Sequence, residues 1–550
     1  MKTAGMLFVC LVLHAQDPYV NYRGVVNAAS FAPPGISGSE IARGSMFSIF
    51  GSNMGPVTLS QVSSFPLSTT LAGVSIKVTQ GNISVDAFPV VVTASQINAI
   101  MPSNAPLGRV SIRVTYNGGT GNPTSAIVAA SGFGIFAVNS GGFGPGILQN
   151  YIAADNQPIN SLAATAAPGQ VITLWGTGLG PVPADNVAPT PGSLPTQVEI
   201  FVGGKLATNL YSGRTPCCSA IDQIVFQVPN DAPLGCYVPV QIRTAGTTLS
   251  NAVTMAIESG GAPCSDPNNP LSSAFEKGGK LGVAVLARSV GYDAINSSPP
   301  QDVTEDLAAL TLRVAPGGPF FFNPAVSAPP IGSCTMYTNS GRQSVFSIPD
   351  LFGGLGAQFA AGPSITVTGA ASASIPNSAM TPLYAAAIGS NDPLFGASAL
   401  TISDSGTTSV SAVGGAGVGP FQVNVPVPAA LDWTNRPQGG TVNRSQPFNV
   451  TWNPAGLGSS LMIIAGTNYD LPTNVQRTFS CTASASAGSF TIPAYILSAL
   501  PATRAEAGKS SSTLMVGLFP AQSVVPFSAT GLDSGLAVEV LSNATTVTFQ

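Results

Sequence analysis

The apolar and polar positions along this chain follow the pattern of short strands. Residues Arg109–Tyr116 read RVSIRVTY, in which apolar and polar side chains alternate strictly. This two-residue period is typical of a strand with one buried face. Val74–Thr79, Phe88–Thr93 and Val198–Val202 are also strand-like and rich in β-branched residues. Because no convincing helical stripe accompanies these strands, the pattern predicts antiparallel β-sandwiches.

Two segments of the chain occur twice. The segment Gln96–Gly108, QINAIMPSNAPLG, is matched by Gln223–Gly235, QIVFQVPNDAPLG. Upstream, ARGSMFSIFGSNMGPV from Ala42 is matched by APGQVITLWGTGLGPV from Ala167. Both matches are separated by about 125 residues, which is the size of a domain rather than of a solenoid turn. The sequence therefore predicts a tandem duplication, with one unit over residues 22–138 and a second over residues 139–260.

The second half of the chain is predicted to hold two further β-rich domains. A polar spacer, SDPNNPLSS, follows Cys264 and marks the start of this half. An irregular β-domain is expected over residues 274–428, and a β-sandwich-like domain with one short helix, Ala494–Leu500, over residues 429–550. The strands expected in the irregular domain are Leu281–Arg288, Leu307–Val314, Ser364–Thr368 and Phe421–Val425.

Composition narrows the possible partners. Charged residues make up 8% of the 550 residues, and the net charge is −4, whereas an average domain has about 25% charged residues. The sequence therefore offers no basic face for nucleic acid or for an anionic membrane surface. A disordered chain is excluded as well, because 44% of the residues are hydrophobic and they occur in short alternating runs.

The N-terminus has the pattern of a bacterial Sec-type signal peptide over residues 1–15. Lys2 provides the positive charge, Met6–Leu13 the short apolar core, and Leu13-His14-Ala15 a cleavage site. The apolar core is too short for a membrane span, which needs about 20 residues. Lipidation at Cys10 is a less favoured alternative, because Val9 stands where a lipoprotein signal has a small residue. A secreted or cell-surface protein with no membrane span is expected.

Six cysteines remain after the predicted signal: Cys217, Cys218, Cys236, Cys264, Cys334 and Cys481. An even number in an exported chain favours disulfides over metal thiolates, and no CxxC spacing supports a zinc site. Two bridges are expected among the first four cysteines, neither of them within the adjacent pair, with the connectivity left open. Cys334 and Cys481 are then expected to pair.

The residue types needed for common catalytic chemistry are scarce. The single histidine, His14, lies in the predicted signal, so the mature chain lacks the most frequent general base and the histidine metal ligands. One dense acidic cluster, Asp302, Glu305 and Asp306, is interpreted as the N-terminal turn of a short helix. No catalytic residue, metal site or cofactor is therefore predicted. A carboxylate-pair glycoside-active enzyme stays open as an alternative.

The two repeated units resemble the IPT/TIG immunoglobulin-like domain. The resemblance is carried by APGQVITLWGTGLGP around Pro168–Gly176 and by the late VPxxAPLG turn, although Arg43 stands where the second unit has Pro168. VVNAASF, GPGILQN and DQIVFQVP are also similar to segments of an extracellular protein family of acidobacteria that was first described in Solibacter. The resemblance covers roughly residues 22–260 and implies tandem immunoglobulin-like sandwiches and export. It brings no catalytic residues.

Exposed aromatic side chains are the remaining candidates for a ligand platform, because sugars stack on aromatic faces. Trp175 and Trp452 are interpreted as core residues, since the first unit has Phe50 at the position of Trp175. Trp433, beside the predicted domain junction, and the run Phe320, Phe321 and Phe322 are the candidate platform.

Three functions remain open at the level of sequence. The first is a non-enzymatic binding or adhesion protein for an extracellular polysaccharide or an envelope protein. The second is a purely structural spacer without a ligand site, and the third is the carboxylate-pair enzyme. Burial of the candidate platform would favour the spacer over the binding protein.

Overall fold

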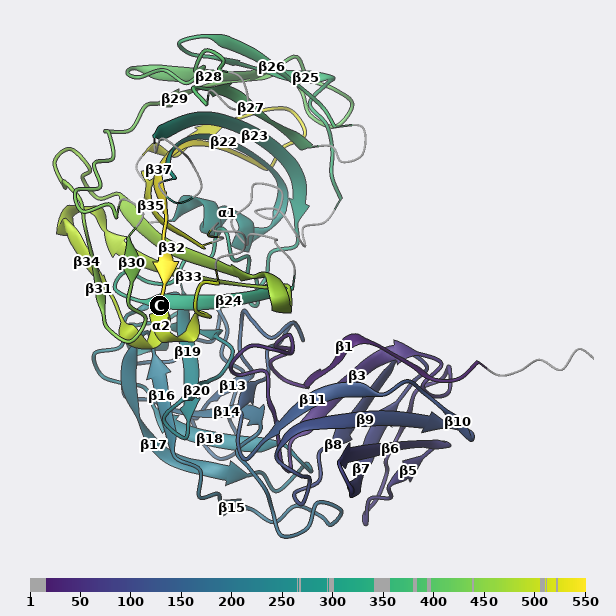
Figure 1. Cartoon of the computed structure of the whole chain (residues 1–550). Helices are drawn as coiled ribbons and strands as arrows, with labels where there is room; N and C mark the ends of the chain where they lie inside the picture. The colour runs from purple at the N-terminus through teal and green to yellow at the C-terminus, as the bar shows by residue number, and fades with distance from the viewer. Residues whose placement is uncertain are drawn as a thin grey trace, which may run out of the picture.

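A computed structural model of the chain shows an all-β protein with two short α-helices among the described residues (Figure 1). It describes residues 16–264, 266, 269–293, 295, 301–340, 357–378, 383–392, 397–437, 440–504, 510, 512–520 and 523–550. The predicted signal peptide, with Cys10 and His14, lies outside the described residues. No helix in the described ranges has the length and apolar character needed to cross a membrane.

The first unit is a sandwich of antiparallel strands around one hydrophobic core. In β9, the apolar positions Val110, Ile112 and Val114 are buried while Arg109 and Arg113 are not, as the alternation predicts. The strands are β1 (Tyr19–Asn27), β2 (Ile41–Ala42), β3 (Met46–Ser52), β4 (Ser60–Gln61), β5 (Thr70–Leu71), β6 (Val74–Gln80), β7 (Ile83–Val92), β8 (Gln96–Ile100), β9 (Gly108–Tyr116), β10 (Gly119–Thr120) and β11 (Thr124–Ala129).

The second unit repeats this arrangement around its own core. The order β3-β8-β7-β6-β9-β11 of the first unit corresponds to β14-β18-β17-β16-β19, with β21 beside β19, in the second. The two units therefore have corresponding strand orders, as a tandem duplication would give. The strands are β12 (Gly134–Ile135), β13 (Leu148–Asn150), β14 (Val171–Thr177), β15 (Gly192–Ser193), β16 (Val198–Val202), β17 (Lys205–Arg214), β18 (Asp222–Gln227), β19 (Gly235–Thr244), β20 (Thr248–Leu249) and β21 (Val253–Ile257).

One nine-stranded sheet extends through the second half of the chain and crosses the predicted boundary at residues 428/429. The last long strand pairs in parallel with the first, in the register Leu281↔Ser534 to Tyr292↔Thr545. The prediction of two separate domains, 274–428 and 429–550, is corrected accordingly. The strands are β22 (Gly279–Tyr292), β23 (Asp302–Ala315), β24 (Cys334–Ser340), β27 (Leu383–Ser390), β32 (Leu461–Asp470), β33 (Val475–Ser484), β35 (Ser512–Phe519), β36 (Val525–Phe527) and β37 (Ser534–Thr546).

Smaller sheets complete this half. A four-stranded sheet packs on β22, β23, β27 and β37 across a shared core (Figure 1). It consists of β25 (Ser364–Thr368), β26 (Ser372–Pro376), β28 (Thr407–Ala412) and β29 (Phe421–Pro426). Two strand pairs, β30 (Thr441–Val442) with β38 (Thr548–Phe549) and β31 (Phe448–Thr451) with β34 (Ser489–Ile492), enclose a second core. The two helices are α1 (Pro270–Lys277) and α2 (Ala494–Ala499), of which the second was predicted.

The acidic cluster begins a strand, and the interpretation as a helix N-terminus is wrong. Asp302, Glu305 and Asp306 lie in β23, which pairs along its whole length with β22. Asp306 lies opposite Arg288 and accepts hydrogen bonds from its Nε and Nη2 at 2.8 and 3.0 Å. Pairing with two neighbouring strands therefore overrides the local preference of these acids for a helix start.

The described residues contain three disulfides, and two of these join the four cysteines Cys217, Cys218, Cys236 and Cys264. Cys334 pairs with Cys481, which confirms the prediction, and Cys236 pairs with Cys264. Cys217 and Cys218 pair with each other, so the expectation that no bridge joins the adjacent pair is wrong. The reason is that β18, six residues long, starts after this pair and ends before Cys236. At about 3.3 Å per residue, it separates the two positions by about 20 Å.

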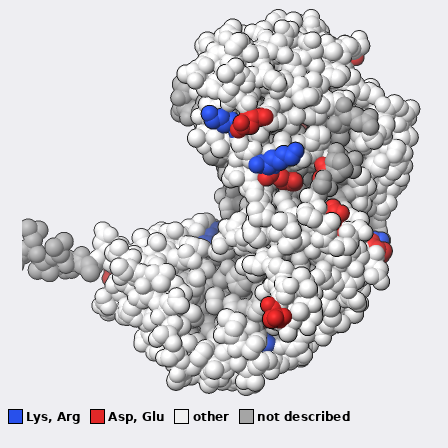
Figure 2. Space-filling model, turned by 180° about the vertical axis from the view of Figure 1, so that it is seen from behind, with Lys and Arg blue, Asp and Glu red and all other residues white. Residues whose placement is uncertain are grey.

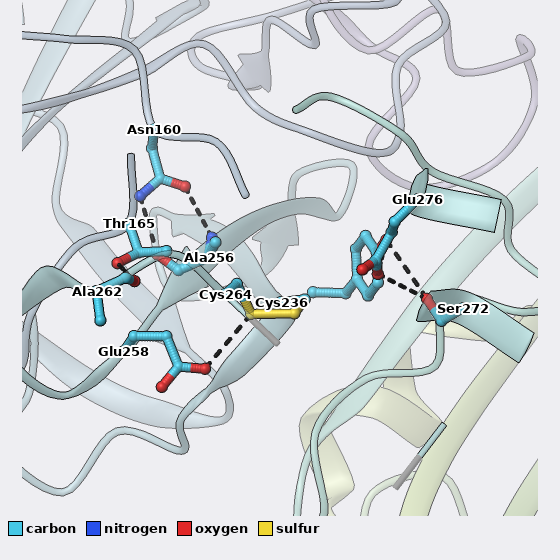
Figure 3. The surroundings of a disulfide bond; sticks show 10 residues. Asn160, Thr165, Cys236, Ala256, Glu258, Ala262, Cys264, Ser272 and Glu276 are labelled. Carbon is cyan, nitrogen blue, oxygen red and sulfur yellow. Dashed lines mark hydrogen bonds between the residues drawn. A yellow bond between two sulfur atoms is a disulfide. The ribbon is translucent and has the colours of Figure 1, made fainter. Parts of the chain in front are cut away.

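The Cys236–Cys264 bridge lies where the second unit meets α1 (Figure 3). On the side of α1, Glu276 accepts hydrogen bonds from the Tyr237 hydroxyl at 2.7 Å and from the Ser272 hydroxyl at 2.9 Å. On the other side, the Asn160 side chain pairs with both backbone polar groups of Ala256. The bridge therefore fixes the start of the second half to the sandwich that precedes it.

The second half also folds back onto both repeated units. The Arg477 guanidinium donates to the Ser37 carbonyl of the first unit at 2.6 Å. Tyr495 of α2 stacks on Phe201 of the second unit, with ring centroids 4.8 Å apart. Seen from behind, the molecule is C-shaped and has a concave side between its two arms (Figure 2). The domains are therefore not strung out in a line.

Candidate functional site

The predicted aromatic platform does not form. Trp433 is only 5% exposed and belongs to the core of the C-terminal region together with Trp452. Its indole nitrogen donates to the Asn435 side chain at 3.0 Å. The prediction for Trp433 is wrong because the backbone at Trp433 bridges to that of Trp452, which turns this segment inward. Trp452 is buried, as predicted.

The run of three phenylalanines joins the two halves of the chain. Phe321 is buried and stacks on Phe275 of α1. Phe322 is half-buried between Phe143 and Tyr237 of the second unit, with ring centroids 6.2 and 5.8 Å away. Only Phe320 of the three is exposed, at 39%. The prediction of a platform at Phe320–Phe322 is therefore corrected to an inter-domain contact.

The aromatic position shared by the two units faces away from both cores. Ile172 and Leu174 point inward from β14, so Trp175 points outward by the alternation of a strand. It is half-buried and donates to the Gln149 side chain at 2.7 Å. Phe50, its counterpart, is also half-buried and lies beside Phe31. The interpretation of Trp175 as a core residue is therefore wrong.

A groove of about 630 Å³ lies along the open edge of the first unit. One wall is β1 and the other is β11, two strands that border the sandwich without pairing with each other. Thr473, from the 3₁₀ turn Leu471–Thr473 of the second half, also lines the groove. The volume lies in the range of small-molecule and oligosaccharide sites. This groove is the candidate functional site.

Two exposed tyrosines of β1 line the groove at a bulge. The register of β1 against β3 shifts between Val20 and Val25, so Tyr22 lies in the looped-out segment and is 84% exposed. Tyr19, which pairs with Ser52 just before the bulge, is 52% exposed. Arg23 lies over the Tyr22 ring, 5.2 Å from its centroid, and has a positive φ of 59°. Bulges and strained backbone of this kind are common at binding sites.

Gly24 allows the bulge to return to the sheet. A Cβ at this position would lie 2.5 Å from the carbonyl oxygen of Phe50, a distance that no side chain tolerates. The close backbone approach therefore requires glycine. This approach fixes the backbone directly after Tyr22 and Arg23, which lie two residues and one residue before Gly24.

The remaining walls are polar. The Asn122 side chain accepts from the Val20 amide at 2.8 Å and donates to the Val20 carbonyl at 3.0 Å, so it closes the groove at one end of β1. Arg109 donates to the Ser125 hydroxyl at 3.0 Å. Arg23 reaches the Pro472 carbonyl of the second half at 3.4 Å. The groove therefore combines aromatic faces with hydrogen-bond donors and acceptors.

Sequence reasoning missed this site for an identifiable reason. The first unit was predicted to start at Tyr22, so Tyr19 fell between the predicted signal peptide and the first unit. In a regular strand, residues 19 and 22 would point to opposite faces, and only the bulge brings both to the groove. The available signal was the density of Tyr19, Tyr22 and Arg23 within DPYVNYRG.

Two deeply buried acids of the second half, Glu539 and Asp306, do not line the groove. Glu539 lies opposite Leu286 in the parallel pair, on the face covered by the four-stranded sheet, and Asp306 lies at the edge of the same face. Burial raises the pKa of Glu539 to about 7, Arg288 opposes this shift, and Asp306 adds to it. Among the described residues, the groove lining contains no Asp or Glu.

No family model matches this chain, and no curated protein does so either. Among solved structures, the chain is similar to the plexin A4 extracellular region (11% identity, 45% of this chain and 19% of that chain, TM-score 0.15). It is also similar to SGBP-B from a complex xyloglucan utilization locus in Bacteroides uniformis (14% identity, 70% of this chain and 89% of that chain, TM-score 0.17). A third similar structure is that of the chicken CNTN1 FN1–FN3 domains (10% identity, 75% of this chain and 98% of that chain, TM-score 0.12). None of the three assigns a role to a residue of the groove.

Proposed function

We propose that this protein is an exported, non-catalytic binding protein for an extracellular polysaccharide, and that the groove between β1 and β11 holds the ligand. The observation that carries the proposal is the pair of exposed tyrosines on the β1 bulge. An exposed tyrosine ring offers an apolar face to a sugar ring, and its hydroxyl can hydrogen-bond as well.

Export is supported by the signal pattern at residues 1–15 and by the disulfides, which persist in oxidising compartments. A non-catalytic role is supported by the acid-free lining of the groove and by the lack of histidine after His14. Glycoside hydrolysis usually needs two carboxyl groups beside the bond to be cleaved. In the part of the chain that the structure describes, the groove offers none.

Burial of Trp433 and Phe321 removes the predicted platform and by itself favours a spacer. The fold-back of the second half is the observation that speaks against a simple spacer. A spacer needs contacts between successive domains only, whereas Arg477 and Tyr495 reach back to the two repeated units. Thr473 of the second half also completes the groove. Such contacts between the second half and the repeated units build a common surface, and they do not increase the length of the molecule as a stalk would require.

The test is a binding screen of the chain from Gln16 onward against a glycan array and insoluble polysaccharides. Binding should fall about 5-fold to 150-fold in Tyr22→Ala, since stacking on one ring contributes roughly 1–3 kcal/mol in comparable aromatic contacts. Tyr151→Ala is the matched control, because Tyr151 is 45% exposed and does not line the groove. Glycan binding that is equally strong in both variants would contradict the proposed site. Binding to an envelope protein through Tyr22, without glycan binding, would replace polysaccharide with protein as the ligand.

A further inference from the structure

The charges of the groove have one sign. Arg23 and Arg109 line it, and no acidic side chain does so among the described residues. The sequence as a whole has the opposite bias, with 23 Asp and Glu against 19 Lys and Arg. On the face shown in Figure 2, charged side chains are few and scattered. Two arginines in one groove are therefore a local departure from the rest of the molecule.

Among the described residues, neither arginine forms an ion pair with a carboxylate. In the described ranges, Arg214, Arg243, Arg288 and Arg436 each contact a carboxylate at 2.8 Å or less. Arg23 and Arg109 instead donate to a backbone carbonyl and to a serine hydroxyl, respectively. Both neutral partners leave most of the five donors of a guanidinium available. The groove therefore presents two unpaired cations beside two exposed aromatic rings.

We infer that the ligand is an acidic polysaccharide, a glycan that carries carboxylate or sulfate groups. This inference rests on the proposed function and specifies its ligand. Each guanidinium would pair with an anionic group through two parallel hydrogen bonds, a geometry that lysine does not offer. The tyrosine rings would contact the sugar faces between the anionic groups. Uronate carboxylates and sulfate groups can both form such pairs, and the experiment distinguishes them by comparing polygalacturonate with dextran sulfate.

The experiment measures the affinity of the disulfide-intact chain from Gln16 onward for polygalacturonate, dextran sulfate, uncharged dextran and polyglutamate at low and high salt. The variants are Tyr22→Ala, Arg23→Gln and Arg109→Gln. Arg113→Gln is the matched control, because Arg113 is an exposed residue of the same strand as Arg109 and does not line the groove. Circular dichroism checks that every variant is folded.

The inference predicts that one acidic glycan binds at least tenfold more tightly than dextran. Its binding should weaken about tenfold in Arg23→Gln and in Arg109→Gln, stay unchanged in Arg113→Gln, and fall with salt. Preference for polygalacturonate identifies uronate as the anion, and preference for dextran sulfate identifies sulfate.

Other outcomes overturn the inference. Tyr22-dependent binding of dextran that equals the binding of both acidic glycans leaves the proposed function intact and refutes the acidic ligand. Equal binding of polyglutamate, lost in the same arginine variants, shows that the groove recognises charge alone and refutes a glycan-specific site. An absence of Tyr22-dependent binding to all these polymers refutes both proposals.

Discussion

Glu539 provides a test of the electrostatics of the second half. Its side chain is 1% exposed, and both carboxyl oxygens lack a hydrogen-bond partner in the described structure. The charged groups near it are Arg288 and Asp306, and Asp404 also bonds to Arg288. Because an unpartnered carboxylate is costly to bury, the side chain binds a proton more tightly in the folded state.

The sign and size of the effect follow from the two pKa values. Burial raises the pKa of Glu539 from 4.5 to about 7, and one unit corresponds to about 1.4 kcal/mol. The protonated side chain therefore contributes its full stability below about pH 4.5, and this contribution is lost as the pH rises through 7. The loss at pH 8 amounts to about 3 kcal/mol. Glu539→Gln has the same shape without the charge and should remove most of this loss.

The assay is urea unfolding at pH 5 and pH 8, followed by tryptophan fluorescence in a Trp175→Phe background. The signal then comes from Trp433 and Trp452, which belong to the second half. Glu539→Gln should raise the free energy of unfolding by about 2–3 kcal/mol at pH 8 and by much less at pH 5. Glu305→Gln, on the partly exposed start of β23, is the control. An equal change at both pH values in Glu539→Gln would refute the reasoning.

Two further predictions concern the disulfide and the bulge. Cys334 and Cys481 are 147 residues apart, so replacing both with alanine should lower the free energy of unfolding by up to about 5 kcal/mol, because the unfolded chain gains loop entropy. Calorimetry should show a lower Tm, and an unchanged Tm would contradict this role. Gly24→Ala should cost roughly 1–3 kcal/mol and abolish Tyr22-dependent glycan binding, because the added Cβ displaces the bulge. Gly192→Ala is the control, because nothing lies within 4 Å of the added Cβ, and it should leave both stability and binding unchanged. Equal glycan binding by the two glycine variants would contradict the role of the bulge.

Local patterns predicted the local elements of this fold. Ser364–Thr368 is β25 with the same bounds, and the helix expected from Ala494 is α2. The duplicated segments predicted two units with the same strand order, because identical turn and strand residues dictate the same pairing. The Cys334–Cys481 pair followed from elimination once the other cysteines were grouped.

Features that depend on pairing between distant segments could not be predicted from the sequence. The pairing of β22 with β37 leaves no mark on either strand, since the short apolar stretches of both are compatible with several neighbours. Trp433 was expected at the surface because a junction was placed beside it, and this junction is crossed by a continuous sheet. The groove was missed because it depends on a bulge, and bulges break the alternation from which exposure is read.

The parallel pair of β22 and β37 sets an order of events during synthesis. The first two units contain all their own strands within residues 19–257, so they can fold as soon as that part of the chain is free. The sheet of the second half cannot be completed until Ser534–Thr546 has arrived. Until then β22 has an unpaired edge, which is a template for wrong partners. The segment Ser534–Thr546 is therefore the last strand that the large sheet needs. Its deletion should leave an aggregation-prone intermediate in which the two repeated units are folded.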